Sequence, residues 1–200
     1  ANAVITGPAR ERVELGDVFV GFKQDQFSQE LQAQFDNGGN LHATYGLYFL
    51  REHVPSHQEA YADDLYALAG SPITFLRTIG DDLTTRSTAA YGQVNWEFAP
   101  SWTLGAGVRY TRETKDYDRT TSTFWGPAFA SLNGTVAFDA SKSWTAVTPS
   151  LSLQKEFSNR VMGYVSANKG FKSGGFNGRA NAVAEATRPE FDPETVWTYE

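Results

Sequence analysis

The chain has 200 residues but no cysteine, a single methionine, and no apolar run of the length that a membrane helix needs. Without cysteine it can form neither a disulfide scaffold nor a thiolate metal site. A membrane-spanning helix requires about 20 mostly apolar residues, so this class is excluded. A transmembrane β-barrel is not excluded, because only every second residue of a barrel strand must be apolar.

Positive charge is also scarce, with 17 Lys and Arg against 23 Asp and Glu and a net charge of -6. This balance argues against a nucleic-acid partner, which would require a basic patch. Residues 1–4 lack the basic start and hydrophobic stretch of a signal peptide. If the protein is exported, its targeting segment lies outside this sequence.

Aromatic residues and glycine are abundant, with 5 Trp, 9 Tyr, 14 Phe and 18 Gly. Aromatic side chains favour strands, and glycine favours turns. Apolar and polar residues alternate in paired segments with a short turn inside each pair, near positions 38, 100 and 159. The predicted strands are 26–36 and 40–51, 84–98 and 102–111, and 147–157 and 161–172, with a seventh opening at 194.

One side of each predicted strand is apolar. Residues 52–83, 116–140 and 173–193 are predicted as long loops, and 37–39, 99–101 and 158–160 as hairpin turns. The facing of 161–172 stays open, because Met162 and Tyr164 oppose Val161 and Val165. The apolar sides of the other strands are Phe27, Leu31, Ala33 and Phe35; Leu41, Ala43, Tyr45, Leu47 and Phe49; Ala90, Gly92, Val94, Trp96 and Phe98; Trp102, Leu104, Ala106, Val108 and Tyr110; Val147, Pro149, Leu151, Leu153 and Phe157.

Short turns at one end, long loops at the other and one apolar face predict an all-β fold, a partial antiparallel transmembrane β-barrel of six to seven long strands in an up-and-down meander. A soluble β-sandwich is the alternative, but its strands average 5–6 residues, whereas these span about 10 to 15. Trp96, Phe98 and Trp102 cluster at a short turn, as in an interfacial aromatic girdle.

Basic residues avoid the costly lipid-facing midplane in this assignment. Lys155 lies beside a short turn, Arg51 and Arg86 are expected at loop ends, and Arg109 falls on the polar side. We also expect a single curved sheet with two open edges, which would make the isolated chain prone to aggregate.

Three segments resemble the barrel domain of TonB-dependent receptors, which take up siderophore-bound iron, haem, cobalamin or carbohydrates. The most specific is VSANKGFKSGGFN at 165–177, followed by FDPETVWTYE at 191–200 and LGAGVRYTRE at 104–113; FSQEL at 27–31 is a weaker match. Within the first segment, Gly174 and Gly175 are expected to let the chain leave the strand and turn sharply. A complete barrel of this kind has about 22 strands. Residues 1–200 are therefore interpreted as a partial barrel without plug domain, TonB box or signal peptide.

Sites for chemistry are weakly indicated. His53 and His57 are spaced like metal ligands on a helix, but Pro55 discourages a helix there. Asp63–Asp64 and Asp81–Asp82 are interpreted as solvated acidic loops. We expect no catalytic, cofactor or metal site and no enzyme activity. Candidates for ligand contact in an external loop are Phe124, Trp125 and Phe129.

The resemblance implies a receptor in the outer membrane of a Gram-negative bacterium, with outer-membrane lipid, TonB and a scarce nutrient as partners. An iron–siderophore complex is favoured because iron receptors are the familiar majority of the family. A passive porin-like channel and, less favoured, a soluble β-rich carbohydrate-binding domain are the alternatives.

Overall fold

The computed structural model describes residues 4–6, 12–14, 16–62, 75–125, 130–158, 160–179 and 190–200. The regular elements in these ranges are all β-strands. None of these ranges contains a helix long and apolar enough to cross a membrane. Two short strands, β1 (Val4–Thr6) and β2 (Arg12–Glu14), pair with each other outside the main sheet.

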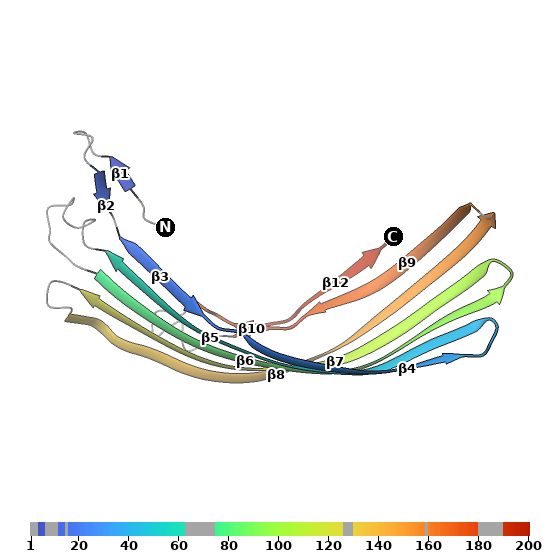
Figure 1. The fold of residues 1–200 in the computed structure, drawn as a ribbon, viewed down its shortest axis with the longest axis horizontal. Coiled ribbons are helices and arrows are strands. Elements are labelled where there is room, and N and C mark those ends of the chain that lie inside the picture. Colours follow the sequence, from blue (N-terminus) through green and yellow to red (C-terminus); the bar gives the residue numbers. More distant parts are fainter. Residues whose placement is uncertain are drawn as a thin grey trace.

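The main sheet is antiparallel and follows the chain order β12-β9-β8-β7-β6-β5-β3, with β4 also paired to β5 (Figure 1). This confirms the up-and-down meander with two open edges. β3 and β4 lie end to end along β5, so together they occupy one strand position. The bounds are β3 (Asp17–Phe22), β4 (Asp25–Asp36), β5 (Leu41–Ala62), β6 (Phe75–Ala99), β7 (Trp102–Trp125), β8 (Ala130–Ser158), β9 (Val161–Lys172) and β12 (Glu194–Tyr199).

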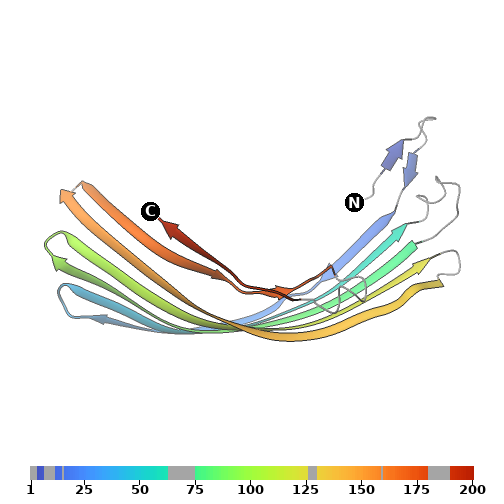
Figure 2. The same cartoon turned by 180° about the vertical axis from the view of Figure 1, so that it is seen from behind.

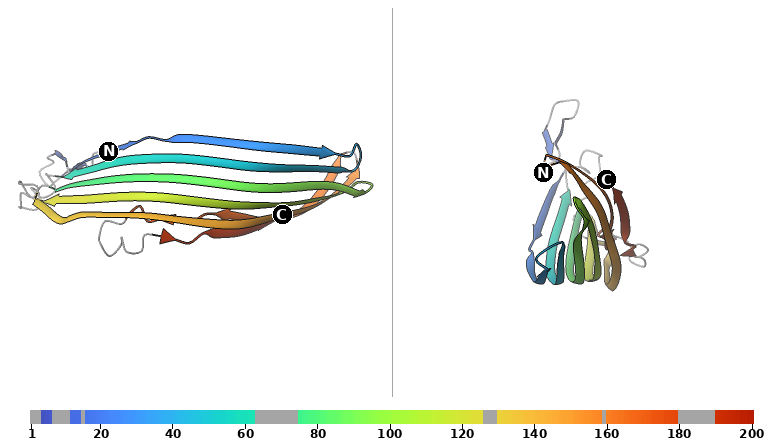
Figure 3. Two further views of the ribbon diagram at one scale, coloured as in Figure 1. Left: turned by 90° about the horizontal axis from the view of Figure 1, so that it is seen from below. Right: turned by 90° about the vertical axis from the view of Figure 1, so that its right-hand side faces the viewer.

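The three predicted hairpin turns are confirmed, and all lie at the same end of the sheet (Figure 3). At the first turn Gly38 has a φ of 72°, and the Asn37 Oδ1 accepts hydrogen bonds from the backbone N–H groups of Gly39 and Leu41. At the second, Ser101 takes a φ of 65°. We refer to this end as the hairpin end and to the other as the far end.

The predicted loops 52–83 and 116–140 are wrong over most of their length. β5 continues to Ala62 and β6 starts at Phe75; likewise β7 continues to Trp125 and β8 starts at Ala130. Residues 63–74 and 126–129 lie outside the described ranges. The strands extend well beyond their alternating segments because backbone pairing needs no apolar side chains, so the sequence pattern ends before the strand does.

Strand register confirms the predicted two faces. Leu47 pairs with Leu31 and Ala90, and Ala90 with Tyr110, so these apolar side chains share one face. We call this face the band face. Its apolar zone near the hairpin end, which includes Leu31, Leu47, Ala90 and Tyr110, is the apolar band. The opposite, polar face carries Gln32, Gly46, Tyr91, Arg109 and Thr148 at the same level.

No second layer covers the apolar band in the described part of the chain: the sheet is a single curved layer (Figures 1 and 3). Leu47 and Val108 remain 58% and 51% exposed, which a sandwich core would not allow. The band covers about nine residues in β5, ~27 Å along the strand and ~21 Å at a tilt of about 40°. This height approaches the ~25 Å apolar belt of outer-membrane barrels.

The register settles the facing of β9. Val165 pairs with Leu153 and Ala167 with Leu151, so both lie on the band face, whereas Tyr164 pairs with Gln154 on the polar face.

The predicted loop 173–193 is also partly wrong, because it holds a two-stranded ribbon, β10 (Gly175–Phe176) with β11 (Glu190–Phe191). Seen from either side, β10 lies within the concavity of the curved sheet (Figures 1 and 2).

Candidate functional site

The polar face holds a hollow of about 500 Å³ between the floor of the sheet and the end of β9. Its floor comes from β6, β7 and β8, and its wall from residues 169–173. The lining includes Arg109, Lys172 and the carboxylate Glu113, and Lys172 is paired with Glu194 at 3.6 Å. Lys169 contributes to the wall, but it shares the parity of Val165 and Ala167, so its side chain lies on the band face. Arg109 has no carboxylate partner among the described residues, so its guanidinium favours an anionic or strongly hydrogen-bonding ligand in the hollow.

The Arg109 guanidinium on β7 lies close to aromatic rings on β5 and β6. The guanidinium carbon lies 5.3 Å from the ring centroid of Tyr48 and 5.6 Å from that of Tyr91, within cation–π range. Tyr91 is itself held, because its hydroxyl donates to Glu30 Oε1 at 2.6 Å and accepts from Gln32 Nε2 at 2.9 Å. This arrangement confirms the predicted polar-side position of Arg109.

The segment Ser173–Phe176, which we call the strap, crosses the polar face beyond Arg109. Lys115 Nζ donates to the carbonyl of Gly174 at 2.9 Å and pairs with Glu113 at 3.3 Å. The Ser173 hydroxyl donates to Glu113. Lys115 and Glu113 both come from β7, so one strand of the floor holds the strap.

Aromatic packing anchors the end of the strap. The ring of Phe176 stacks on Tyr117 with centroids 5.7 Å apart and contacts Trp144 at 6.0 Å. A Cβ on Gly174 would meet the Phe191 carbonyl oxygen and lie 2.6 Å from Trp144 Cε2, and one on Gly175 would lie 2.6 Å from the Phe191 ring. The two glycines therefore serve close approach to the sheet, which refines the predicted role in a sharp turn.

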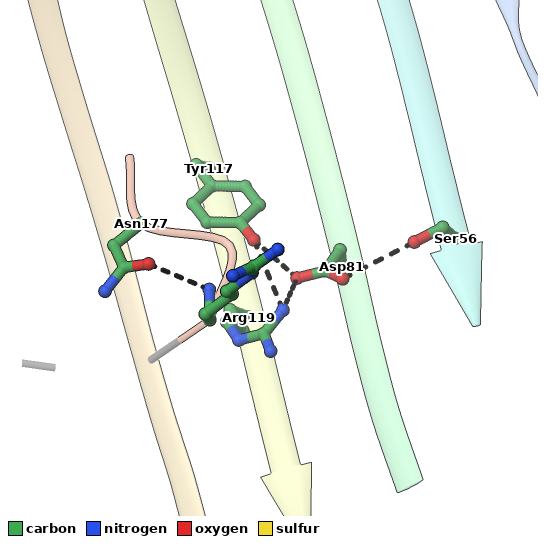
Figure 4. A network of polar contacts seen from close by, with 6 residues as sticks. Ser56, Asp81, Tyr117, Arg119 and Asn177 are labelled. Carbon is green, nitrogen blue, oxygen red and sulfur yellow. Dashed lines mark hydrogen bonds and ion pairs between the residues drawn. The ribbon is translucent and has the colours of Figure 1, made fainter. Parts of the chain in front are cut away.

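Beyond the strap, Asp81 joins three neighbouring strands through a buried polar network (Figure 4). Its Oδ1 accepts from the Tyr117 hydroxyl and from Arg119 Nη1, both at 2.5 Å, and Ser56 lies 3.5 Å from Oδ2. The Arg119 side chain is only 2% exposed. Tyr117 lies seven residues beyond the apolar band; burial, with the hydrogen bond to Asp81, raises its pKa to about 12. The network links β5, β6 and β7 through side chains that bind one another.

The residues predicted to contact a ligand do not lie together in the structure. Phe124 and Trp125 are consecutive residues at the end of β7, so their side chains point to opposite faces. Trp125 lies on the polar face and packs edge-on against Phe75 with centroids 5.2 Å apart, whereas Phe124 lies on the band face. Phe129 lies outside the described residues. Ligand contact by these residues stays a prediction, and Phe124 and Trp125 cannot contact one ligand from the same face.

The members of the histidine pair and of the aspartate pair are also kept apart, because both pairs lie in β-strands. His53 and His57 are four residues apart in β5, about 13 Å along a strand, so they cannot share one ion. His53 Nε2 lies 2.8 Å from Asp82 Oδ1, and His57 Nε2 lies 2.9 Å from Glu59 Oε1. Asp81 and Asp82 occupy opposite faces of β6. Asp63 and Asp64 lie outside the described residues.

Sequence reasoning missed the network of Asp81, Tyr117 and Arg119, because all three fall in stretches predicted as loops. It also missed that the strap folds back onto β7. The one available signal was the motif at 165–177, which marked these residues as distinctive without showing what they contact.

A single-layer antiparallel sheet with an uncovered apolar band and a polar concave face defines a section of the wall of a transmembrane β-barrel. The family model described as "TonB dependent receptor-like, beta-barrel" matches residues 6–200, and the chain belongs to this family. Its known members are outer-membrane proteins of Gram-negative bacteria.

Among solved structures, the chain is similar to the ferric yersiniabactin uptake receptor FyuA from Yersinia pestis. The TM-score is 0.69 at 20% sequence identity, over 94% of this chain and 27% of that one. The chain thus spans about a quarter of the structure that it matches, and the likeness supports the fold.

Proposed function

We propose that the chain forms part of the wall of an outer-membrane TonB-dependent receptor that imports an iron–siderophore complex. Both edges of the main sheet are open, and a barrel wall needs further strands to pair with them. Outer-membrane lipid would contact the apolar band, the far end would face the outside, and the polar face would line the lumen. TonB would supply the energy for uptake.

The observation that carries this proposal is the hollow on the polar face. The Arg109 guanidinium lies within cation–π range of Tyr48 and Tyr91 and lines this hollow, and Lys172 on the wall formed by β9 is paired with Glu194. A negatively charged chelate is the kind of ligand that such a lining attracts. The similar receptor from Yersinia pestis is named for ferric yersiniabactin, which supports an iron chelate here.

Family membership argues against a passive porin. The uncovered apolar band argues against a soluble carbohydrate-binding domain, because an exposed apolar surface of this extent needs a membrane or a partner.

Growth tests the proposal directly. A strain in which the complete gene is deleted is supplied with one ferric siderophore at a time, and uptake of the same radiolabelled chelate is measured. We expect growth and uptake to fail on one chelate, to return with the gene, and to be absent from a strain without TonB.

The variants Arg109→Gln and Arg109→Lys then test the hollow. The Gln variant should take up the chelate more slowly at equal receptor abundance, with the Lys variant in between. Loss of growth on cobalamin or a carbohydrate in place of an iron source would contradict the iron assignment. Uptake that is independent of TonB would contradict the whole proposal.

A further inference from the structure

Three arginines lie on the band face, just past the apolar band on the side of the far end. Arg51 lies two residues beyond Phe49 in β5, and Arg112 two residues beyond Tyr110 in β7. Arg86 lies on β6 between them in the sheet order. All three side chains are exposed. Arg51 and Arg86, which were expected at loop ends, are therefore strand residues, and Arg112 lies near them in the sheet.

The register brings these cations close together. Arg51 is directly opposite Arg86, and Arg86 is directly opposite Thr114, two residues from Arg112. Like charges directly opposite each other destabilise an antiparallel pair. Arg86 has a partner, because its Nη1 lies 2.5 Å from Asp116 Oδ2. Arg51 and Arg112 make no hydrogen bond or ion pair with any described part of the chain.

Arg51 also lines a hollow of about 370 Å³ on the sheet, together with Phe27 and His53. Asp25 contributes to the same hollow, but in the register it is opposite His53 and not Arg51. The Phe27 ring therefore lies next to a guanidinium that has no partner among the described residues, where the apolar band ends on the side of the far end.

We propose that Arg51 and Arg112, on either side of the Arg86–Asp116 pair, bind the phosphate headgroup of a lipid whose acyl chains lie along the apolar band. The inference rests on the membrane placement in the proposed function. Guanidinium groups bind phosphate in a bidentate manner, and the adjoining apolar zone fits acyl chains, so the surface matches both parts of one amphipathic molecule.

Carboxylates on the far-end side of the arginines limit where along the strands the phosphate can bind. Asp82, Asp118 and Asp139 lie directly side by side across β6, β7 and β8 on the band face. Such a row repels phosphate. The anion-binding level is thus confined between the apolar band and the acidic row, which is where the headgroup of an inserted lipid lies.

The test uses the complete receptor purified in a neutral detergent. Native mass spectrometry measures the binding of phosphatidic acid and of phosphatidylcholine with the same acyl chains. We expect the parent to prefer phosphatidic acid, and Arg51→Gln with Arg112→Gln to bind it about tenfold to thirtyfold less tightly, a factor of about five for each lost charge. Binding of phosphatidylcholine, whose choline cation offsets its phosphate charge, should change much less.

Two controls isolate the charge. Ser143→Gln with Thr145→Gln alters two neutral side chains on β8 at the same level and should bind phosphatidic acid like the parent. Arg51→Lys with Arg112→Lys keeps both charges and should stay within about threefold of the parent. If the double Gln variant does not fold, Arg112→Gln alone should still weaken binding about fivefold.

Equal binding of the two lipids by the parent would overturn the inference, as would equal losses in the Gln and Ser143/Thr145 variants. Inorganic phosphate is the third probe: if it binds as tightly as phosphatidic acid, the site takes a free anion and not a lipid. The outcome is independent of the nutrient, since a receptor for another cargo would still show the lipid preference. A confirmed iron receptor without that preference would refute this inference alone.

Discussion

Strands β5 to β8 each have one half near the hairpin end and one half near the far end. The two halves differ in the side chains that their two faces carry. In the first half, apolar Leu47 and Val108 point one way and polar Tyr91 and Arg109 the other. In the second half both faces carry charged side chains: Asp82, Asp118 and Asp139 lie on the band face, and Asp81 and Arg119 on the opposite one, beside packed aromatic rings. Alternation in the sequence therefore reports contact with lipid, whereas the strand itself continues where both faces meet water or protein.

This difference explains how the far half is held together. A lipid-bathed sheet needs only backbone pairing and an apolar exterior, but a sheet in water needs side-chain contacts to stay ordered. The far half has them on the polar face: the Asp81 network, the stacked rings of Tyr117 and Phe176, and the strap on Lys115. The predictions below test whether the two halves depend on these different interactions, and all use the complete receptor.

The largest effect is expected from removing a buried charge in the far half. Arg119→Met leaves the Asp81 carboxylate without its cation, and loss of one member of a buried pair costs about 3–5 kcal/mol. Unfolding by urea, followed by tryptophan fluorescence, measures the loss. The double variant Asp81→Leu, Arg119→Met removes both charges and should lose less than Arg119→Met alone. A double variant as unstable as the single one would show that the ion pair is not what stabilises this half.

The sequence was sufficient to predict the hairpin-end half. The turn at 37–39 and the faces of Leu41–Phe49 depend on local glycine conformation and on alternation, both visible in a single chain. β9 and the start of β12 were also placed at their observed bounds, but the facing of β9 became clear only from the register.

The far half could not be predicted in this way, because its contacts join residues far apart in the chain. Arg119 meets Asp81, which is 38 positions earlier, and Ser173 meets Glu113, which is 60 positions earlier. Neither pair has a periodic signature. Arg109 was assigned to the correct face by alternation, but its contact with both Tyr48 and Tyr91 depends on the register of three strands.

A second prediction compares one substitution in the two halves of the band face. Leu47→Arg places a charge inside the apolar band and should cost roughly 2–4 kcal/mol, whereas Thr120→Arg, on the same face of the far half, should cost about 0–1 kcal/mol. Unfolding free energies in lipid vesicles give both values. Equal costs would mean that lipid does not end where the alternation ends.

The third prediction concerns the close approach of the strap. Gly174→Ala inserts a methyl group against Trp144 and the Phe191 carbonyl, and overpacking of this kind costs about 1–3 kcal/mol. Gly21→Ala is the matched control, because its Cβ would have its nearest neighbour at 3.7 Å, an ordinary contact. Trp144 fluorescence and urea unfolding should change for the first variant and stay nearly constant for the second. Similar behaviour of the two would remove the packing argument for the motif glycine.

The smallest effect is confined to alkaline pH and tests the burial of Tyr117. Its pKa is raised to about 12 from 10.0, chiefly by burial and then by Asp81, so the folded chain retains the hydroxyl proton more strongly than the unfolded chain. The resulting stability is fully present below pH 10 and is lost as the pH rises toward 12. Tyr117→Phe has no proton to lose and should show a shallower decline over this interval, measured by urea unfolding in detergent at several pH values.

Tyr110→Phe is the control, because Tyr110 is exposed on the apolar band and its removal should leave the parent's steeper decline in place. If the slopes of Tyr117→Phe and the parent coincide, Tyr117 ionises equally in both states, and the far half is more open to water than its packing indicates.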